Sequence, residues 1–261
     1  MPAELPGLLP QWPAPATVRS FCSTRGGGLS APPFDSLNLG DHVGDDPPAV
    51  AANRAAFARA IGARPVFLAQ VHGTDVASLR EDTADRTVAD GCVTRMPGVA
   101  CTIMVADCLP VLFCDRAGTT VAAAHAGWRG LAGREGAGIL EQTLSAFAAA
   151  ADIGPGALGA QTLVWLGPCI GPLSFEVGPE VRDAFVAHDA SAGCHFQPGR
   201  NGKWLADLAG LARKRLAARG ITAVSGNDGG EDWCTVRDRS RFFSHRRDGH
   251  SGRFAAAVWL G

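Results

Sequence analysis

The sequence contains no tyrosine, and only two of its 24 basic residues, Lys203 and Lys214, are lysines. Together with the abundance of alanine and glycine, this favours a GC-rich coding bias, so an arginine in this chain is weak evidence of function by itself. A charge excess is also missing, because the formal net charge is -1 over 261 residues. The chain therefore has no global field that would attract nucleic acid or an anionic membrane.

Long apolar runs are absent as well. No stretch reaches the roughly 18 consecutive apolar residues of a membrane-spanning helix, and the N-terminal segment lacks the cationic start and apolar run of a secretion signal. The eight cysteines include no CxxC pair, and Cys101, Cys108 and Cys114 lie within or beside apolar runs. We therefore expect a cytoplasmic protein without membrane partners, in which most cysteines are reduced core thiols.

The length and the 46% of hydrophobic residues are sufficient for one core, so we expect a single domain over residues 1–261 and a monomer. Residues 17–23 predict a strand, and the Gly-, Pro- and Asp-rich segment that follows predicts a long irregular loop. A helix is predicted next, with Asp46 as its N-cap, prolines in its first turn and its end near Gly62.

The remaining pattern predicts an α/β or α+β fold with a mixed sheet flanked by helices. Apolar runs punctuated by glycine or proline favour buried strands. We expect such strands within 65–73, 98–115, 119–127, 162–171, 221–226 and 254–261. Helices are expected at about 131–150, 178–188 and 203–219.

Three of the strand-like runs end on a side chain that can coordinate a metal. "FLAQVHG" ends at His72, "TIMVADC" ends at Cys108 and "VAAAHAG" ends at His125. Neighbouring strands lie about 4.8 Å apart, so ligands at their ends can converge. Two imidazoles and a thiolate suit zinc, and three protein ligands leave a fourth position for water or substrate, as in a catalytic site.

Two other interpretations of these residues stay open at this point, because gaps of 35 and 16 residues match no short zinc motif. In one, His125 is a buried histidine bonded to a carbonyl and Cys108 is a small core thiol. In the other, Cys108 is a nucleophile, His125 is its base, and Asp107 orients the histidine.

Several segments together resemble one known family, the YfiH or laccase-domain (polyphenol oxidase) proteins. They run in the family's order from residue 23 to residue 253: "STRGGGLSAPPFDSLNLGDHVGDDPPAVAANR", "QVHGTDV", "ADGCVT", "ADCLPVLF", "AHAGWRGL", "GPCIGPLSFEVGPEV" and "RFFSHRRDGHSGR". The resemblance implies zinc binding by His72, Cys108 and His125. Phe34 and His245 stand where family members often have tyrosine, so a phenolic hydroxyl has no role at these two positions here.

The older family name implies copper and phenol oxidation. A multicopper oxidase needs more histidines than the seven of this chain, commonly in H-x-H pairs, and no such pair occurs. A single blue-copper site would need an axial ligand such as Met104, but four residues of extended strand span about 13 Å, too far for Met104 and Cys108 to share one ion. We therefore expect zinc, with copper as the alternative.

The resemblance implies phosphorolysis of adenosine, inosine and methylthioadenosine, with adenosine deamination as a second activity. Zinc suits both, since it lowers the pKa of bound water and orients oxyanions. The H-x-E…P-C-x-x-C signature of zinc nucleobase deaminases is absent, so deamination would need another proton carrier. Asp75 and Glu176 are candidates by chemistry, although solvated or capping carboxylates explain both.

Phosphate and the nucleoside also require contacts. Arg129, in the glycine-rich turn after His125, is a candidate phosphate contact. In the "RR" pair we prefer Arg247 to Arg246 as an anion or ribose contact. The long N-terminal loop offers Asn38 and His42 as hydrogen-bonding groups, and Cys169 is expected in a tight loop near the pocket. Each of these side chains also has a purely structural interpretation, as a turn former, a solvated arginine or an inert thiol.

The function classes that remain are therefore a zinc-dependent purine nucleoside phosphorylase, a copper-dependent polyphenol oxidase, a metal-free cysteine hydrolase, and a role in the quality control of peptidoglycan precursors. The last is also associated with the family that the chain resembles. The resemblance favours the first, and it implies a nucleoside and phosphate as small-molecule partners.

Overall fold

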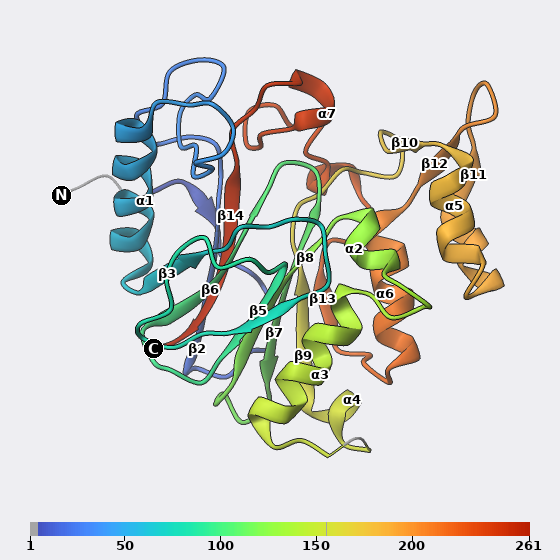
Figure 1. The fold of residues 1–261 in the computed structure, drawn as a ribbon, viewed down its shortest axis with the longest axis horizontal. Coiled ribbons are helices and arrows are strands. Elements are labelled where there is room, and N and C mark those ends of the chain that lie inside the picture. Colours follow the sequence, from blue (N-terminus) through green and yellow to red (C-terminus); the bar gives the residue numbers. More distant parts are fainter. Residues whose placement is uncertain (1–4, 155) are drawn as a thin grey trace.

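The computed structural model describes residues 5–154 and 156–261. Two mixed sheets pack face to face and helices cover their outer faces, which gives four layers (Figure 1). The predicted α/β class with mixed sheets flanked by helices is confirmed, although the strands are divided over three sheets.

The first sheet has five strands in the order β1-β2-β14-β6-β3. Its strands are β1 (Gly7–Leu8), β2 (Val18–Ser23), β14 (Phe254–Leu260), β6 (Val99–Val105) and β3 (Arg64–Phe67). The second sheet has six strands in the order β13-β9-β7-β8-β5-β4. Its strands are β13 (Val224–Gly226), β9 (Thr162–Leu166), β7 (Leu109–Asp115), β8 (Val121–Ala126), β5 (Gly91–Thr94) and β4 (Val76–Ser78).

The central strands are apolar on both faces because both faces are covered. In β14, Phe254, Ala256 and Val258 face the layer between the two sheets, whereas the alternate residues face the helix α1 (Pro47–Ile61). This follows from the two-residue period of a strand. The first sheet thus lies between α1 and the second sheet.

The outer face of the second sheet is covered mainly by α3 (Ile139–Ala151) and α6 (Leu208–Ala218). The short helices α2 (Trp128–Ala132) and α4 (Leu158–Gln161) precede and follow α3 along the chain. The 3₁₀ turn η2 (Glu231–Trp233) and the helix α7 (His245–Asp248) lie between β13 and β14 in the chain.

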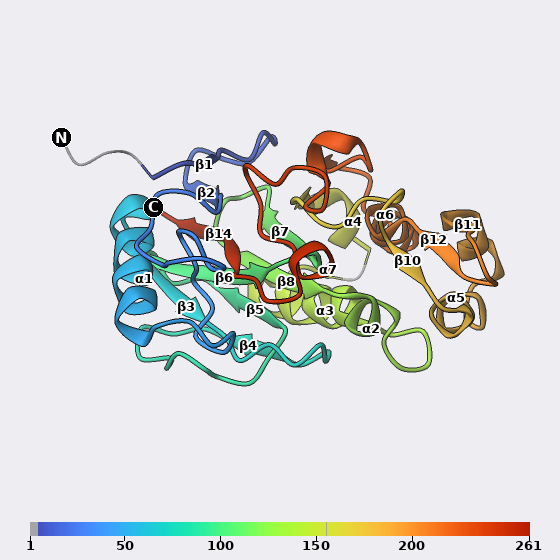
Figure 2. The ribbon, with the colours of Figure 1, turned by 90° about the horizontal axis from the view of Figure 1, so that it is seen from above.

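A small lobe projects from one end of the molecule (Figures 1 and 2). It consists of a three-stranded antiparallel sheet in the order β10-β12-β11, together with α5 (Pro179–Val186) and the 3₁₀ helix η1 (Ala190–His195). Its strands are β10 (Glu176–Val177), β12 (Trp204–Ala206) and β11 (Phe196–Pro198).

Most sequence predictions of local structure are confirmed. Helix α1 is capped by Asp46 and ends at Gly62, which has a left-handed conformation with φ 64°. Two predictions were wrong in detail. The helix expected at 131–150 is interrupted, because the chain leaves the helical conformation between Gly133 and Gly138, and the helix expected at 203–219 begins only at Leu208, after β12.

No helix in the described part of the chain is long and apolar enough to span a membrane. The single-domain organisation, the monomeric state and the cytoplasmic location stay predictions.

Candidate metal centre and its cavity

The three predicted ligands lie where the chain passes between the two large sheets. His72 lies on the connection from β3, in the first sheet, to β4, in the second. Cys108 lies on the connection from β6 to β7, which joins the same two sheets. His125 is in β8, on the same face of the strand as Val121 and Ala123, whose side chains face the layer between the sheets.

The prediction that each ligand ends a strand is therefore only partly right. Strand β3 ends at Phe67, five residues before His72, and His72 itself has a left-handed backbone with φ 60°. Cys108 directly precedes β7, and His125 is the last residue but one of β8. The three side chains converge because of the two crossings and not because three strand ends meet.

The donor atoms form a compact group. One ligand atom from each of His72, Cys108 and His125 lies within 4.8 Å of the other two. His72 Nε2 is 3.7 Å from Cys108 Sγ, and the imidazole rings of the two histidines have centroids 4.8 Å apart at an interplanar angle of 68°. In a tetrahedral zinc site, bonds of about 2.05 Å to nitrogen and 2.3 Å to sulfur separate those two donors by about 3.5 Å. This donor set and spacing fit a zinc ion.

Asp90, which the sequence analysis did not single out, holds the most buried ligand. Its carboxylate is fully buried and lies 2.8 Å, Oδ1 to Nδ1, from the ring of His125. The backbone amide of His125 also donates to the carbonyl of Asp90 at 2.7 Å. Nδ1 of His125 is therefore occupied, and Nε2 is the nitrogen left for an ion.

The charges of the cluster favour a deprotonated sulfur. Burial disfavours the thiolate of Cys108, but the charge of His125 and hydrogen bonds from both histidines outweigh burial and lower the pKa of Cys108 to about 6. Burial likewise disfavours the imidazolium form of His125, but the Cys108 thiolate and the hydrogen bond to Asp90 raise its pKa to about 9. The thiolate is the form of cysteine that binds metals and acts as a nucleophile.

A cavity of about 340 Å³ opens beside the three donors. Its apolar wall includes Trp128, Ile170 and Phe175. The polar groups that line it include His42, Gln70, His245, Arg246 and Arg253. His72 is exposed, whereas His125 is only 3% exposed, so the donor cluster is open on one side only.

Of the predicted substrate contacts, His42 is the one that lines this cavity. Burial and the positive charge of Arg253 lower the pKa of His42, and the neighbouring Asp41 carboxylate opposes them. His245, which stands at a position often occupied by tyrosine in the family, also lines the cavity. Met104 is a lining residue too, but its sulfur lies 3.9 Å from Nη2 of Arg54.

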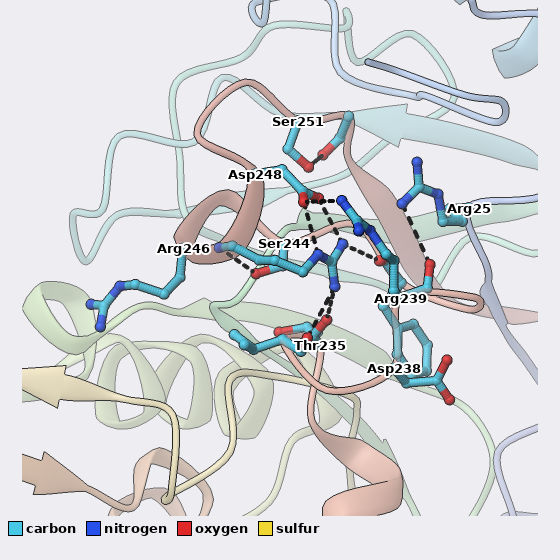
Figure 3. Close-up of polar contacts among 12 residues, drawn as sticks. Arg25, Thr235, Asp238, Arg239, Ser244, Arg246, Asp248 and Ser251 are labelled. Carbon is cyan, nitrogen blue, oxygen red and sulfur yellow. Dashed lines mark hydrogen bonds and ion pairs between the residues drawn. The ribbon is translucent and has the colours of Figure 1, made fainter. Parts of the chain in front are cut away.

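The two neighbouring arginines lie in different surroundings, which favours Arg246 over the predicted Arg247 as a contact in this cavity. The guanidinium of Arg247 donates to the carbonyls of Thr235, Val236 and Phe242 and forms an ion pair with Asp248, and it lines a different, larger cavity. Arg246 lines the cavity at the donor cluster, and Figure 3 shows its side chain extending away from the cluster around Asp248. Helix α7 therefore presents its two arginines to different sides.

Three other predicted contacts also have positions that argue against direct contact with a ligand in this cavity. Asn38 is fully buried, and its side chain bonds to Gly40, Asp45 and the amide of Arg253. Cys169 is buried and accepts a hydrogen bond from Asn227 at 3.3 Å, and burial raises its pKa well above the ordinary value. Arg129 is exposed and packs on the Trp128 ring outside the lining.

None of the three carboxylates considered from the sequence, Asp75, Glu176 and Asp107, is placed as a proton carrier or as the partner of His125. Asp75 is exposed and Glu176 forms an ion pair with Lys203, and neither lines the cavity. Asp107 lines the cavity, but it accepts hydrogen bonds from Thr235 Oγ1 and from the Arg246 amide, each at 2.6 Å. The residue that orients His125 is Asp90 and not Asp107.

Sequence reasoning missed Asp90, Arg253 and the aromatic side chain of Phe175. A signal existed for Asp90, because a carboxylate directly before the buried strand β5 has to find partners. Arg253 directly precedes the buried strand β14 in the same way. No comparable signal marks Phe175.

Comparison with known proteins adds independent information. Residues 19–261 match the family model described as multi-copper polyphenol oxidoreductase laccase. The purine nucleoside phosphorylase of Pseudomonas aeruginosa is 55% identical over 254 residues, which cover 97% of this chain and 98% of that protein. YfiH of Escherichia coli, also named a purine nucleoside phosphorylase, is 49% identical over 256 residues, with the same shares of coverage.

Solved structures share the fold. Protein NMB0706 of Neisseria meningitidis has a TM-score of 0.89 and 46% identity, and the match covers 97% of this chain and 98% of that one. YlmD from Geobacillus stearothermophilus has a TM-score of 0.82 and 29% identity, with coverage of 98% and 99%. The family description thus names a copper oxidoreductase, whereas the two relatives from Pseudomonas aeruginosa and Escherichia coli are named purine nucleoside phosphorylases.

Proposed function

This chain belongs to the polyphenol oxidoreductase laccase family, which includes the YfiH proteins, and on that premise we propose that it is a zinc-dependent purine nucleoside phosphorylase. The relatives that are 49% and 55% identical carry the name of this activity. The observation that supports it best is a His/Cys/His donor group that is open on one side to a cavity lined by two arginines. Such a site can hold an oxyanion next to a metal.

In this proposal His72, Cys108 and His125 hold the zinc ion. When bound, zinc supplies a Lewis acid that orients an oxyanion or lowers the pKa of a bound water to about 7. The donor set argues for zinc, since imidazole and thiolate suit it. A metal-free cysteine hydrolase would use the Cys108 and His125 pair, but it gives no role to His72, whose Nε2 lies 3.7 Å from the sulfur.

Arg246 and Arg253 are the proposed phosphate contacts. Nη1 of Arg253 donates to the carbonyls of Ser251 and Gly252, and Nη1 of Arg246 donates to the carbonyl of Glu176 at 2.9 Å. These bonds fix each guanidinium at the cavity wall, and a carbonyl partner, unlike a carboxylate, does not neutralise the positive charge. Fixed guanidinium groups are well suited to bind phosphate oxygens.

The purine would pack against the apolar wall formed by Trp128, Ile170 and Phe175. Phosphorolysis breaks the bond between C1′ of the ribose and N9 of the base, and a phosphate oxygen forms the new bond to C1′. The departing base takes up a proton, and His42 and His245 are the imidazoles in the cavity that can donate one.

We further propose that the substrates are adenosine, inosine and methylthioadenosine, and that adenosine deamination is a second activity. The relatives' names support purine nucleosides as a class, and the finer choice rests on the family resemblance. For deamination, a proton carrier inside the cavity is needed, and His42 and His245 now replace Asp75 and Glu176 as candidates. The proposal includes a monomeric enzyme whose partners are the nucleoside and phosphate.

The test uses protein purified without a histidine tag, stripped with a chelator and reloaded with zinc or copper. The zinc form should convert inosine and phosphate to hypoxanthine and ribose 1-phosphate, and should release no base when phosphate is omitted. Phenol oxidation by the copper form without phosphorolysis by the zinc form would identify an oxidase. Activity that survives the chelator but is lost with iodoacetamide would identify a cysteine hydrolase, and turnover of peptidoglycan precursors alone would identify an editing role.

A further inference from the structure

Asp90 accepts hydrogen bonds from three successive backbone amides of the segment that carries the first histidine. The amides of Val71, His72 and Gly73 lie 3.1, 2.9 and 2.7 Å from its carboxylate oxygens. Successive N–H groups that converge in this way form an anion-binding nest. The nest includes the left-handed conformation of His72, φ 60°, which is uncommon for any residue other than glycine. The carboxylate thus stabilises the turn from which the His72 ring reaches Cys108.

The same carboxylate contacts the second histidine. Oδ1 of Asp90 accepts from the His72 amide and also lies 2.8 Å from Nδ1 of His125. A carboxylate bonded to Nδ1 keeps the proton on that nitrogen and leaves Nε2 as the free ligand. One buried side chain therefore controls the backbone of one ligand and the tautomer of another.

This arrangement requires a carboxylate rather than any polar group. Four donors point at the two oxygens of Asp90, and the side chain is 0% exposed, so no bulk water can replace a lost acceptor. An asparagine has one acceptor oxygen, and its NH₂ group would face either the Val71 and Gly73 amides or the His72 and His125 donors. Either orientation turns two of the four donors toward an NH₂ group instead of an acceptor.

We propose that Asp90 is the positioning residue that directs both His72 and His125 toward a single metal ion. This inference rests on the proposed function only in assuming that the donor group binds a metal. It makes no assumption about the substrate.

The experiment compares Asp90→Asn with the matched control Asp82→Asn, which changes an exposed aspartate of the segment between β4 and β5. Zinc affinity is measured by competition with a coloured chelator, and the geometry of the ligands is measured from the visible spectrum of the cobalt-substituted protein. For Asp90→Asn we expect zinc affinity to fall 10- to 100-fold and the cobalt spectrum to change, and we expect Asp82→Asn to match the parent protein.

Equal zinc affinity and equal cobalt spectra in Asp90→Asn and the parent protein would overturn the inference. If the parent protein itself binds no zinc, the proposed metal site fails instead, so the two failures are distinguishable. A measurement without any variant covers the case in which Asp90→Asn does not fold. In ¹⁵N spectra of the zinc-loaded parent protein, His125 should carry a proton on Nδ1 and the metal on Nε2, and the opposite assignment would also overturn the inference.

Discussion

The Oδ2 atom of Asp107 accepts a hydrogen bond of 2.6 Å from the backbone amide of Arg246, a residue 139 positions later in the chain. Its Oδ1 atom accepts another of 2.6 Å from the hydroxyl of Thr235. Asp107 directly precedes Cys108 and has a left-handed backbone with φ 97°. One carboxylate thus ties the turn that carries the sulfur donor to helix α7, which carries the proposed phosphate contact.

These hydrogen bonds predict that a substitution of Asp107 weakens phosphate binding without weakening metal binding. In Asp107→Ala the start of α7 loses its anchor, so we expect KM for phosphate to rise about tenfold or more while bound zinc is unchanged. The measurement is steady-state phosphorolysis of inosine at varied phosphate, together with elemental analysis.

Asp107→Asn is the matched control for this prediction. Its amide oxygen can accept from Arg246, and its NH₂ group can donate to Thr235, whose hydroxyl is able to reverse its role. We therefore expect KM for phosphate in Asp107→Asn to remain within about threefold of the parent value. Loss of zinc in Asp107→Ala would contradict the division of roles between Asp90 and Asp107.

The three donor residues should be essential for the metal. We expect His72→Ala, Cys108→Ala and His125→Ala each to lose bound zinc and phosphorolysis while the chain still folds, because a catalytic metal is not the source of core stability. His125→Ala should also lower the free energy of unfolding by about 1–3 kcal/mol, since it leaves the buried Asp90 carboxylate without its ring partner. Elemental analysis and urea unfolding measure both effects.

Exposed Cys194 provides the control for this series. Cys194→Ala should bind zinc and turn over inosine like the parent protein, because this residue does not belong to the donor cluster. Full metal content in any of the three donor variants would remove that residue from the ligand set.

The sequence grouped His72, Cys108 and His125 as candidate donors, because each follows an apolar strand-like run, and the family resemblance then favoured metal binding over the other interpretations. The sequence was not sufficient to predict how the donors meet. Strand β3 ends five residues before His72, and the ligand segment is stabilised by the carboxylate of Asp90, which comes from a separate segment. Contacts of this kind depend on the packing of the two sheets and leave no periodic pattern in the chain.

The different surroundings of Arg246 and Arg247 could not be predicted for the same reason. In a four-residue helix such as α7, successive side chains point in directions about 100° apart, so neighbouring residues reach different surroundings. Which of the two faces the cavity depends on how α7 is anchored, through Ser244 Oγ to the Arg247 amide and through Asp107 to the Arg246 amide. Sequence alone gives no information on that anchoring.

The two arginines should therefore respond differently to truncation. Arg246→Ala should raise KM for phosphate about tenfold or more and change the free energy of unfolding by less than about 1 kcal/mol, because its side chain is exposed at the cavity. Arg247→Ala should lower the free energy of unfolding by about 2–4 kcal/mol, because three backbone carbonyls and Asp248 lose their partner. The reverse result would restore Arg247 as the phosphate contact.

The pair of Arg247 and Asp248 also predicts a dependence of stability on pH. Hydrogen bonds from Arg247 lower the pKa of Asp248 below 3.8, with burial opposing and the charges of Arg247 and Arg239 assisting. The carboxyl titrates lower in the folded than in the unfolded chain, so its stabilisation is fully present above about pH 5 and is lost as pH falls through the folded pKa. Asp248→Asn should therefore be less stable than the parent at pH 7, by about 1–3 kcal/mol.

Urea unfolding at pH 7 and at pH 3 measures this effect, with Asp82→Asn as the exposed control. The difference between Asp248→Asn and the parent protein should shrink at the lower pH. A difference that stays constant between the two pH values would show that the charge of Asp248 is not the stabilising feature.

Gly127 lies so near two of the donor side chains that a larger residue there tests their arrangement. A Cβ atom at this position would lie 2.8 Å from Cδ2 of His72 and 3.0 Å from Cys108 Sγ, which is too close for either donor to keep its place. The backbone of Gly127, φ -70° and ψ 159°, is accessible to alanine, so Gly127→Ala adds no backbone strain. Its effect should fall on the donors alone. We expect zinc affinity to fall about tenfold or more, with the free energy of unfolding changed by less than about 1 kcal/mol.

Gly154→Ala, where an added Cβ meets no atom within 4 Å, should leave zinc affinity unchanged. Parent-like zinc affinity in Gly127→Ala would mean that the ion is not held by His72 and Cys108 in the arrangement described, because those two donors cannot both stay in place beside the added methyl group.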